Sequence, residues 1–316
     1  MTDVLRPGAK VECVFTGAFW AEGPAFGPDG LVYFCDITMT FRTDGAAGNI
    51  FRHDPRTSET TVFRSPSGMA AGIKFDSQGR MLCTCGADFG SQGVVRTDMT
   101  TGRSTILAGL YNGRPFNAPN DLDIDDQDRV YFTDPRYFGH EPVEQPVFGV
   151  YRIDPGGPVS LVLADVARPN GIAIGPGARS LVVVEHDFLR SDRRIANVPV
   201  RNGPMRLLRY DLSKDGVPSN QRVLVDYQDE SGADGIAFDA TGRLYAAVRS
   251  AVRPGVRVYD ADGREIAEII VPETPTNVAF VPLPDGPWLY IAAETSLYRI
   301  AVTTLGRPYR WMDGRA

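Results

Sequence analysis

The chain has 316 residues, 43% of them hydrophobic, and carries 33 Lys and Arg against 39 Asp and Glu, for a net charge of -6. This length suits about two average domains or one large repeat-built domain, and the acidic balance without a long basic run argues against nucleic acid as a partner. No run of about 18 apolar residues could form a membrane helix and the first residues lack the apolar core of a signal peptide, so we expect a cytoplasmic protein without a membrane partner.

Six segments of one pattern follow each other along the chain. Each has a short alternating apolar segment, a tight turn rich in Gly, Asp or Pro, and a more continuous apolar segment, which predicts a β-hairpin. In chain order these are EGPAFGPDGLVYFCDI from Glu22, AGIKFDSQGRMLCTCG from Ala71, NDLDIDDQDRVYFTDP from Asn120, NGIAIGPGARSLVVVEH from Asn170, DGIAFDATGRLYAAV from Asp234 and NVAFVPLPDGPWLYIAA from Asn277. Successive starts are 49, 49, 50, 64 and 43 residues apart.

A second motif follows each hairpin, namely IFRHD, VVRTD, VYRID, LLRYD, VRVYD and LYRIA, and a further strand comes after it. Each repeat therefore supplies about four strands, and no convincing long amphipathic helix interrupts them. The predicted fold is an all-β, six-bladed β-propeller with four antiparallel strands per blade, forming a single domain over residues 1–316. Spacing alone would also suit an array of β-sandwiches. We expect VECVFTG (11–17) and RPYRWMD (307–313) to supply outer strands of the closing blade, because an open ring would leave bare strand edges.

The first residue of each repeat predicts a polar channel. In a propeller the first strand of every blade faces the central axis, so equivalent repeat positions converge there. The six equivalents are Glu22, Ala71, Asn120, Asn170, Asp234 and Asn277, five of which carry a side-chain oxygen. Polar groups gathered in this way need water or a cation among them. Carboxylate and amide oxygens without sulfur or imidazole favour a hard cation, calcium first, although Asx-turns at strand starts would produce the same residues.

The four cysteines do not form a recognisable metal motif. Cys83 and Cys85 make a CTC sequence, and Cys13 and Cys35 stand alone. We expect all four to be reduced and most to be buried as small apolar residues.

Five of these motifs together resemble a known family. EGPAF, PND followed by VYFTDP, RPNGIAI, DGIAFDATGRLY and PTNVAF occur in this order at blade spacing. They are similar to the senescence marker protein/gluconolactonase/luciferin-regenerating enzyme family of six-bladed propellers, and the resemblance covers almost the whole chain. It implies one divalent cation, Ca²⁺ first with Mg²⁺, Mn²⁺ or Zn²⁺ as alternatives, and hydrolysis of a small sugar-type lactone. The ligands that it implies are Glu22, Asn120, Asn170 and Asp234.

The resemblance also implies how the reaction would proceed. A bound divalent cation would polarise the lactone carbonyl and stabilise the oxyanion, and Asp234 would either accept a proton from water or attack directly. No Gly-x-Ser-x-Gly sequence occurs and the three histidines lie far apart in the repeats, which argues against a serine-hydrolase triad. Sugar-lactonase members often carry an arginine two residues before the ND pair, where this chain has Ala118. Arg114, upstream in the same loop, is the candidate to replace it.

The loops after the second strands should line the channel mouth. The longest are DPRYFGHEPVEQPVFG (134–149) in blade three and EHDFLRSDRRIANVPVRNGPMR (185–206) in blade four. Because loops on a rigid scaffold commonly determine specificity, the candidates for substrate contact are Tyr137, His186 and Arg190. Further lid candidates are Phe138, His140, Arg193 and Arg194. Asp134 and Glu185 end their second strands near the predicted site and could support it.

Two other functions suit the same motifs. One is a phosphotriesterase-like hydrolase of the diisopropyl fluorophosphatase type, because polarising a phosphoryl oxygen requires the same metal. The other is a non-catalytic propeller that binds a ligand or protein on its top face around a structural cation. The oligomeric state cannot be predicted from these patterns.

Overall fold

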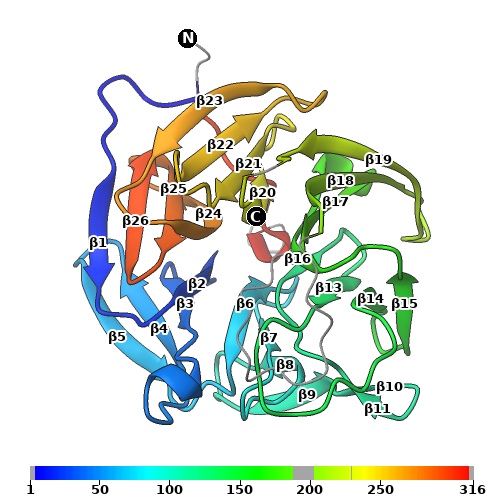
Figure 1. Cartoon of the computed structure of the whole chain (residues 1–316). Helices are drawn as coiled ribbons and strands as arrows, with labels where there is room; N and C mark the ends of the chain where they lie inside the picture. The colour runs from blue at the N-terminus through cyan, green and yellow to red at the C-terminus, as the bar shows by residue number, and fades with distance from the viewer. Residues whose placement is uncertain (1–3, 188–202, 229, 313–316) are drawn as a thin grey trace.

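The strands form a ring of six blades. The computed structural model describes residues 4–187, 203–228 and 230–312. In this part of the chain, six four-stranded antiparallel sheets surround a central axis (Figure 1). The all-β, six-bladed propeller predicted from the repeats is confirmed.

Five sheets follow chain order from the inner to the outer strand. Blade one contains β2 (Ala21–Phe26), β3 (Val32–Asp36), β4 (Asn49–Asp54) and β5 (Glu59–Arg64). Blade two contains β6 (Ala70–Phe75), β7 (Met81–Cys85), β8 (Gly93–Thr97) and β9 (Ser104–Ala108). Blade three contains β12 (Leu122–Ile124), β13 (Val130–Asp134), β14 (Gly149–Ile153) and β15 (Val159–Leu163). Blade four contains β16 (Pro169–Ile174), β17 (Ser180–His186), β18 (Met205–Leu212) and β19 (Pro218–Asp226). Blade five contains β20 (Ala233–Phe238), β21 (Leu244–Val248), β22 (Gly255–Tyr259) and β23 (Glu265–Ile270).

The remaining elements are the closing blade and a few short segments. Blade six contains β24 (Pro275–Leu283), β25 (Gly286–Ala293), β26 (Ser296–Ala301) and, as its outer strand, β1 (Glu12–Thr16). A two-stranded hairpin of β10 (Leu110–Tyr111) and β11 (Arg114–Pro115) lies between blades two and three in the chain. The short 3-10 helices are η1 (Thr40–Arg42), η2 (Pro176–Ala178) and η3 (Arg310–Met312).

Within the described residues, the N-terminal strand closes the ring. β1 pairs with β26, with Glu12 opposite Arg299, as expected for VECVFTG. The expectation for RPYRWMD was wrong: its described residues, 307–312, form no strand of blade six and instead cross the far end of the channel. There Tyr309 donates a hydrogen bond to the carbonyl of Phe280 on β24. The place of the outer strand is already taken by β1, and the aromatic rings of this segment gain burial by packing on the inner strands instead.

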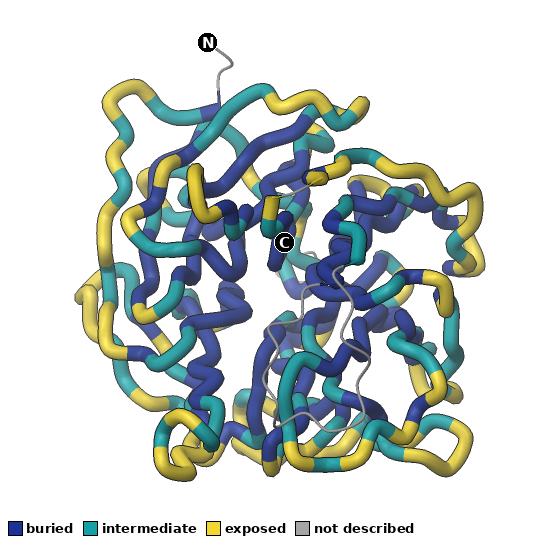
Figure 2. The backbone as a smooth tube through the Cα atoms, in the orientation of Figure 1, coloured by how far each residue is buried: buried dark blue, intermediate teal, exposed yellow. Residues whose placement is uncertain are grey.

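Inner strands and interblade contacts make the core. β2, β6, β12, β16, β20 and β24 each contact the next inner strand around the ring. Figure 2 shows these strands buried, whereas most of the exposed residues lie on the outer strands and turns. Apolar clusters fill the space between neighbouring blades, as where Tyr245 of blade five meets Phe280 of blade six with ring centroids 4.9 Å apart. This packing gives the channel rigid walls.

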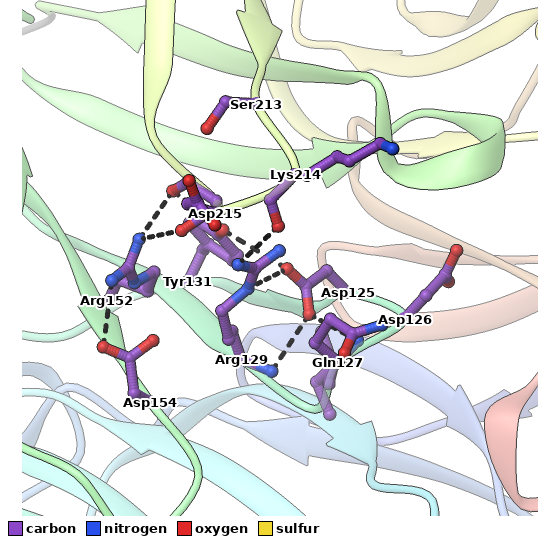
Figure 3. A network of polar contacts seen from close by, with 12 residues as sticks. Asp125, Asp126, Gln127, Arg129, Tyr131, Arg152, Asp154, Ser213, Lys214 and Asp215 are labelled. Atoms are coloured by element: carbon purple, nitrogen blue, oxygen red, sulfur yellow. Dashed lines mark hydrogen bonds and ion pairs between the residues drawn. The ribbon is translucent and has the colours of Figure 1, made fainter.

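A repeated turn secures the hairpin ends. In blade three, Asp125 accepts hydrogen bonds from the N–H of Gln127 at 2.8 Å and from Arg129 Nε at 2.6 Å. Arg129 in turn donates to the carbonyl of Lys214, and Arg152 donates to that of Asp215, so the β18–β19 turn of blade four is tied to blade three (Figure 3). The same Asp-x-x-x-Arg pairing recurs at Asp76 and Arg80 and at Asp239 and Arg243.

Two other expectations concern cysteines and membranes. All four cysteines are free; Cys35, Cys83 and Cys85 are buried, and Cys13 is exposed. Among the described residues, no helix has both the length and the apolar character needed to cross a membrane.

Candidate metal and substrate site

The starts of the inner strands meet at one end of the channel. Glu22 lies on β2, Asn170 on β16 and Asp234 on β20, each one residue after the strand begins. The strands approach so closely here that only glycine fits between them: a Cβ on Gly23, whose φ is +52°, would lie 2.0 Å from the carbonyl oxygen of Ala71. A Cβ on Gly235 would lie 2.1 Å from the side chain of Asn277. The predicted convergence of repeat positions is therefore present in the structure.

Bulges aim these side chains at the axis. The pairing register shifts between Glu22 and Ala25 on β2, between Pro169 and Ile172 on β16, and between Ala233 and Ile236 on β20. A bulge bends a strand and redirects the side chains beside it. Simple strand alternation would not place three polar residues of otherwise apolar strands in the same buried space.

The site is rich in buried carboxylates. Glu22, Asp121 and Asp234 are all buried, at 8%, 3% and 5% exposure. Burial raises the pKa of Glu22 well above its usual value, and the carboxylates of Asp234 and Asp121 raise it further. Burial also raises the pKa of Asp234, although Arg249, with Nη1 3.3 Å from Oδ2, opposes this shift. The raised pKa values indicate that nearby positive charges and hydrogen-bond donors do not fully compensate the charge of these buried carboxylates.

The amides of the predicted set occupy different positions. Asn170 is buried, and its side-chain amide lowers the pKa of both Asp234 and Tyr137. Asn120 is half-buried just before β12, where its N–H donates to the carbonyl of Thr133 at 2.9 Å. Asn277 donates from Nδ2 to Glu22 Oε2 at 3.2 Å, while its Oδ1 accepts the N–H of Val278. Asn277 therefore orients Glu22 and has its own oxygen engaged.

These residues fit a hard divalent cation. Within the described ranges, no three or more His, Cys, Asp and Glu side chains gather as a metal-binding group. The predicted ligands are a different set, because half of them are amides. Two buried carboxylates under mutual repulsion, with the Asn170 amide beside Asp234, give oxygen donors and surplus negative charge. Both properties suit calcium or magnesium. The ligand roles of Glu22, Asn120, Asn170 and Asp234 stay predictions.

Tyr137 and His186 adjoin this group, as expected for mouth residues. The Tyr137 hydroxyl donates to the carbonyl of His186 at 3.2 Å, and burial together with the charge of Asp234 raises its pKa. His186 Nδ1 lies 2.7 Å from the carbonyl of Ala233, the residue before Asp234, and therefore carries the proton. Burial and the charge of Arg249 lower the pKa of His186 to about 4. The imidazole is neutral at pH 7, and the phenol is protonated.

Carboxylates at the ends of second strands hold the segments that lead into the site. Asp134 accepts the N–H groups of Asn117 and Ala118 at 2.9 and 2.8 Å, just before Asn120. Glu185 accepts the N–H of Ala167 at 2.9 Å, just before Asn170.

Blade one repeats this arrangement. Asp36 accepts the N–H groups of Phe19 and Trp20 at 2.7 and 3.0 Å, just before Glu22. The supporting position suggested for Asp134 and Glu185 is thus observed, and Asp36, which the repeat pattern did not single out, shares it.

The other predicted substrate contacts lie elsewhere or outside the described residues. Arg114 is exposed on the β10–β11 hairpin, and its Nη1 donates to the carbonyl of Glu144 at 3.3 Å. Its observed contact is therefore with the blade-three loop rather than with Glu22 or Asp234. Arg190, with the lid candidates Arg193 and Arg194, falls in residues 188–202, outside the described part of the chain.

Three site residues were missed in the sequence. Asp121 had a usable signal, since it follows Asn120 where four other repeats have glycine after the first position. Burial raises its pKa to about 6, and it lies 3.4 Å from Asn277 Nδ2. Arg249 and Trp20 had no such signal. The guanidinium of Arg249 lies 4.8 Å from the Trp20 ring centroid while it contacts Asp234, so the pair joins blades five and one across the site.

The chain is similar to a described family, to a curated relative and to solved structures. The family model described as the SMP-30/Gluconolactonase/LRE-like region matches residues 20–295. A gluconolactonase of Zymomonas mobilis is 27% identical over 331 aligned positions, which cover 96% of this chain and 84% of that protein. A solved gluconolactonase structure from Xanthomonas campestris superposes with a TM-score of 0.77 at 22% identity, covering 93% of this chain and 90% of that one. A calcium-binding regucalcin structure from Agrobacterium tumefaciens gives 0.71 at 22%, covering 93% and 94%. At such identities the two structures show the shared fold.

Proposed function

This chain belongs to the SMP-30/gluconolactonase/LRE-like family, and from that premise we propose that it is a divalent-metal-dependent hydrolase that opens a small, sugar-type lactone. The observation that carries the proposal is the buried pair of Glu22 and Asp234, whose carboxylates repel each other at the channel mouth with the Asn170 amide alongside. The Zymomonas mobilis relative, named a gluconolactonase, supports the reaction class.

Glu22, Asn120, Asn170 and Asp234 would hold the cation. When bound there, a divalent ion supplies Lewis acidity that polarises the lactone carbonyl and opposes the negative charge that develops on its oxygen. We propose Ca²⁺ as the native ion, because the donors are all oxygen and the Agrobacterium tumefaciens structure is described as calcium-binding.

Asp234 is the proposed catalytic residue. Its carboxylate accepts a proton from the attacking water and so acts as the general base. Arg249 contacts Oδ2 at 3.3 Å and fixes the orientation of the carboxylate. The buried Asn170 amide comes from another blade and lowers the pKa of the same carboxyl group.

The mouth residues serve substrate binding in this proposal. Tyr137 is protonated at neutral pH and can donate to a substrate hydroxyl or ring oxygen. His186 is neutral and hydrogen-bonded to the strand that carries Asp234, so it adds no positive charge near the cation.

The test combines metal analysis with a substrate panel. The purified protein is stripped with a chelator, reloaded separately with Ca²⁺, Mg²⁺, Mn²⁺ and Zn²⁺, and assayed on an aldonolactone and on a phosphotriester. We expect metal-dependent opening of the lactone at a rate well above that of the phosphotriester. A preference for the phosphotriester would assign the same site to the other hydrolase class. Bound metal without turnover of either substrate would indicate a structural cation in a binding protein.

A further inference from the structure

A pocket separate from the candidate metal site lies beside the channel mouth, between the loops of blades one, two and three. Its volume is about 460 Å³, within the range of small-molecule sites. Phe41, Met69 and Phe89 form much of its lining, and His140 closes one side. Phe89 is 75% exposed, although its ring centroid is 5.0 Å from that of His140. An aromatic ring held open to solvent at the edge of a pocket is available to a ligand.

The polar wall of this pocket is already engaged in contacts within the protein. Asp88 is fully buried, and its carboxylate accepts the N–H of Thr40 at 2.6 Å and the Thr40 hydroxyl at 2.8 Å. His140 Nε2 lies 3.1 Å from the same carboxylate. These contacts involve both oxygens of Asp88, which leaves them fewer positions for a ligand. The pocket therefore favours an uncharged, apolar group.

The backbone that presents Phe89 is held in an uncommon conformation. Asp88 and Phe89 both have left-handed φ values, 69° and 66°. Their successive N–H groups donate to the two oxygens of Glu141, at 2.9 and 2.6 Å. Arg136, fully buried, lies 3.6 Å from Glu141 and anchors it. Two adjacent N–H groups that converge on one carboxylate form a nest, which keeps the exposed ring in place.

This strain is concentrated at the pocket. Thirteen non-glycine residues in the described part of the chain have positive φ. Five of these line the pocket or adjoin a lining residue, namely Met39, Asp44, Met69, Asp88 and Phe89. Such conformations are sparsely populated and often occur at ligand-binding regions.

The pocket is connected to the candidate site by one loop. Tyr137, which adjoins Asn170 and His186, and His140, which lines the pocket, are three residues apart between β13 and β14. Three residues span at most about 11 Å. Between them, Phe138 contacts Phe41 of blade one with ring centroids 6.1 Å apart. A substrate whose ring lies at Asp234 and Tyr137 could thus extend a substituent into the pocket.

We propose that this pocket binds a hydrocarbon substituent of the lactone, about the bulk of a phenyl ring, and that Phe89 and His140 determine specificity for it. The proposal rests on the lactonase function above and narrows its substrate class from bare sugar lactones to lactones that carry an apolar side group. The engaged Asp88 carboxylate, the open Phe89 ring and the shared loop all point to this occupant.

The experiment compares δ-valerolactone with its 5-phenyl derivative, and measures binding of 2-phenyltetrahydropyran, a cyclic ether that cannot be hydrolysed, by calorimetry. Phe89→Ala removes the exposed ring, and Ala47→Trp fills the pocket from an exposed lining position. Val252→Ala is the control, because Val252 is 94% exposed on blade five. We expect both pocket variants to lower kcat/KM for the phenyl lactone about five- to tenfold, mainly through KM, and to weaken ether binding equally. Activity on δ-valerolactone should stay within about twofold.

Other outcomes would overturn the proposal or separate it from the lactonase function. Equal loss on both lactones, or no loss on either, would overturn the proposal, as would absence of ether binding by a wild type that hydrolyses lactones. Dissociation of a dimer by Phe89→Ala in sedimentation would also overturn it, by showing that Phe89 contacts a second copy. If the metal-loaded wild type hydrolyses neither lactone, yet binds the ether in a Phe89-dependent way, the lactonase function fails while the pocket assignment stands.

Discussion

Replacing Asp234 by asparagine would separate its chemistry from its part in the fold. The amide keeps an oxygen in nearly the same place, but it cannot accept a proton from water or attack a carbonyl. Loss of a general base costs about 10²- to 10⁴-fold in rate, or about 3 to 5 kcal/mol in activation free energy. We expect kcat for lactone hydrolysis to fall within that range.

The cost to stability should be much smaller. Asp234 pairs with Arg249 at 3.3 Å, but the Arg249 side chain is 27% exposed. Partly exposed pairs contribute about 0 to 1 kcal/mol. Loss of the charge also relieves repulsion with Glu22, whose pKa is raised in part by Asp234. The free energy of unfolding should therefore change by no more than about 1 kcal/mol.

The assay measures initial rates at saturating cation, so that chemistry is separated from metal occupancy, together with urea unfolding. Asp239→Asn is the matched control at the other end of β20, five residues or about 17 Å away along the strand. Its buried carboxylate accepts from Thr241 and from Arg243, including Arg243 Nε at 2.6 Å. This control should lose about 1 to 3 kcal/mol of stability and keep its activity. An Asp234→Asn protein that is folded, metal-loaded and within about threefold of the wild-type rate would refute the catalytic assignment.

Three further predictions concern the cation, pH and folding. Glu22→Gln and Asn170→Ala should each lower the bound metal and its affinity, measured by elemental analysis and titration, whereas exposed Asn220→Ala should not; unchanged metal in both site variants would mean that the ligands are misplaced. His53 is buried, and its pKa is lowered to about 4. The histidine of the unfolded chain therefore binds a proton more readily than that of the folded chain, and the free energy of unfolding decreases as pH falls from about 6.5 to about 4. His53→Gln should lower the slope of unfolding free energy against pH in this window by about 1 kcal/mol per pH unit; an unchanged slope would contradict this. Limited proteolysis should release no independently folded half, because we propose that residues 1–316 form a single domain.

Much of the fold was predictable because the same hairpin pattern occurs six times in the sequence. Hairpin patterns starting at Glu22, Ala71 and their equivalents predicted the blades, and a closed ring required a strand from one chain end, which β1 provides. The position of residues 307–312 was not predictable. Their aromatic residues suit an outer strand as well as a cover for the channel, and only the available surface on the inner strands decides between them.

The sequence by itself determined the architecture and the polar character of the channel, since periodicity and repeat register are local properties that survive without coordinates. Tertiary structure alone decided which side chains interact at the mouth. Arg249 meets Asp234 and Trp20, Asn277 turns its nitrogen to Glu22, and Asp88 joins His140 across two loops. These pairs come from different blades, and the distance between them depends on how the ring closes. Contact across a closed ring is a property of all six blades together, so no single segment of sequence encodes it.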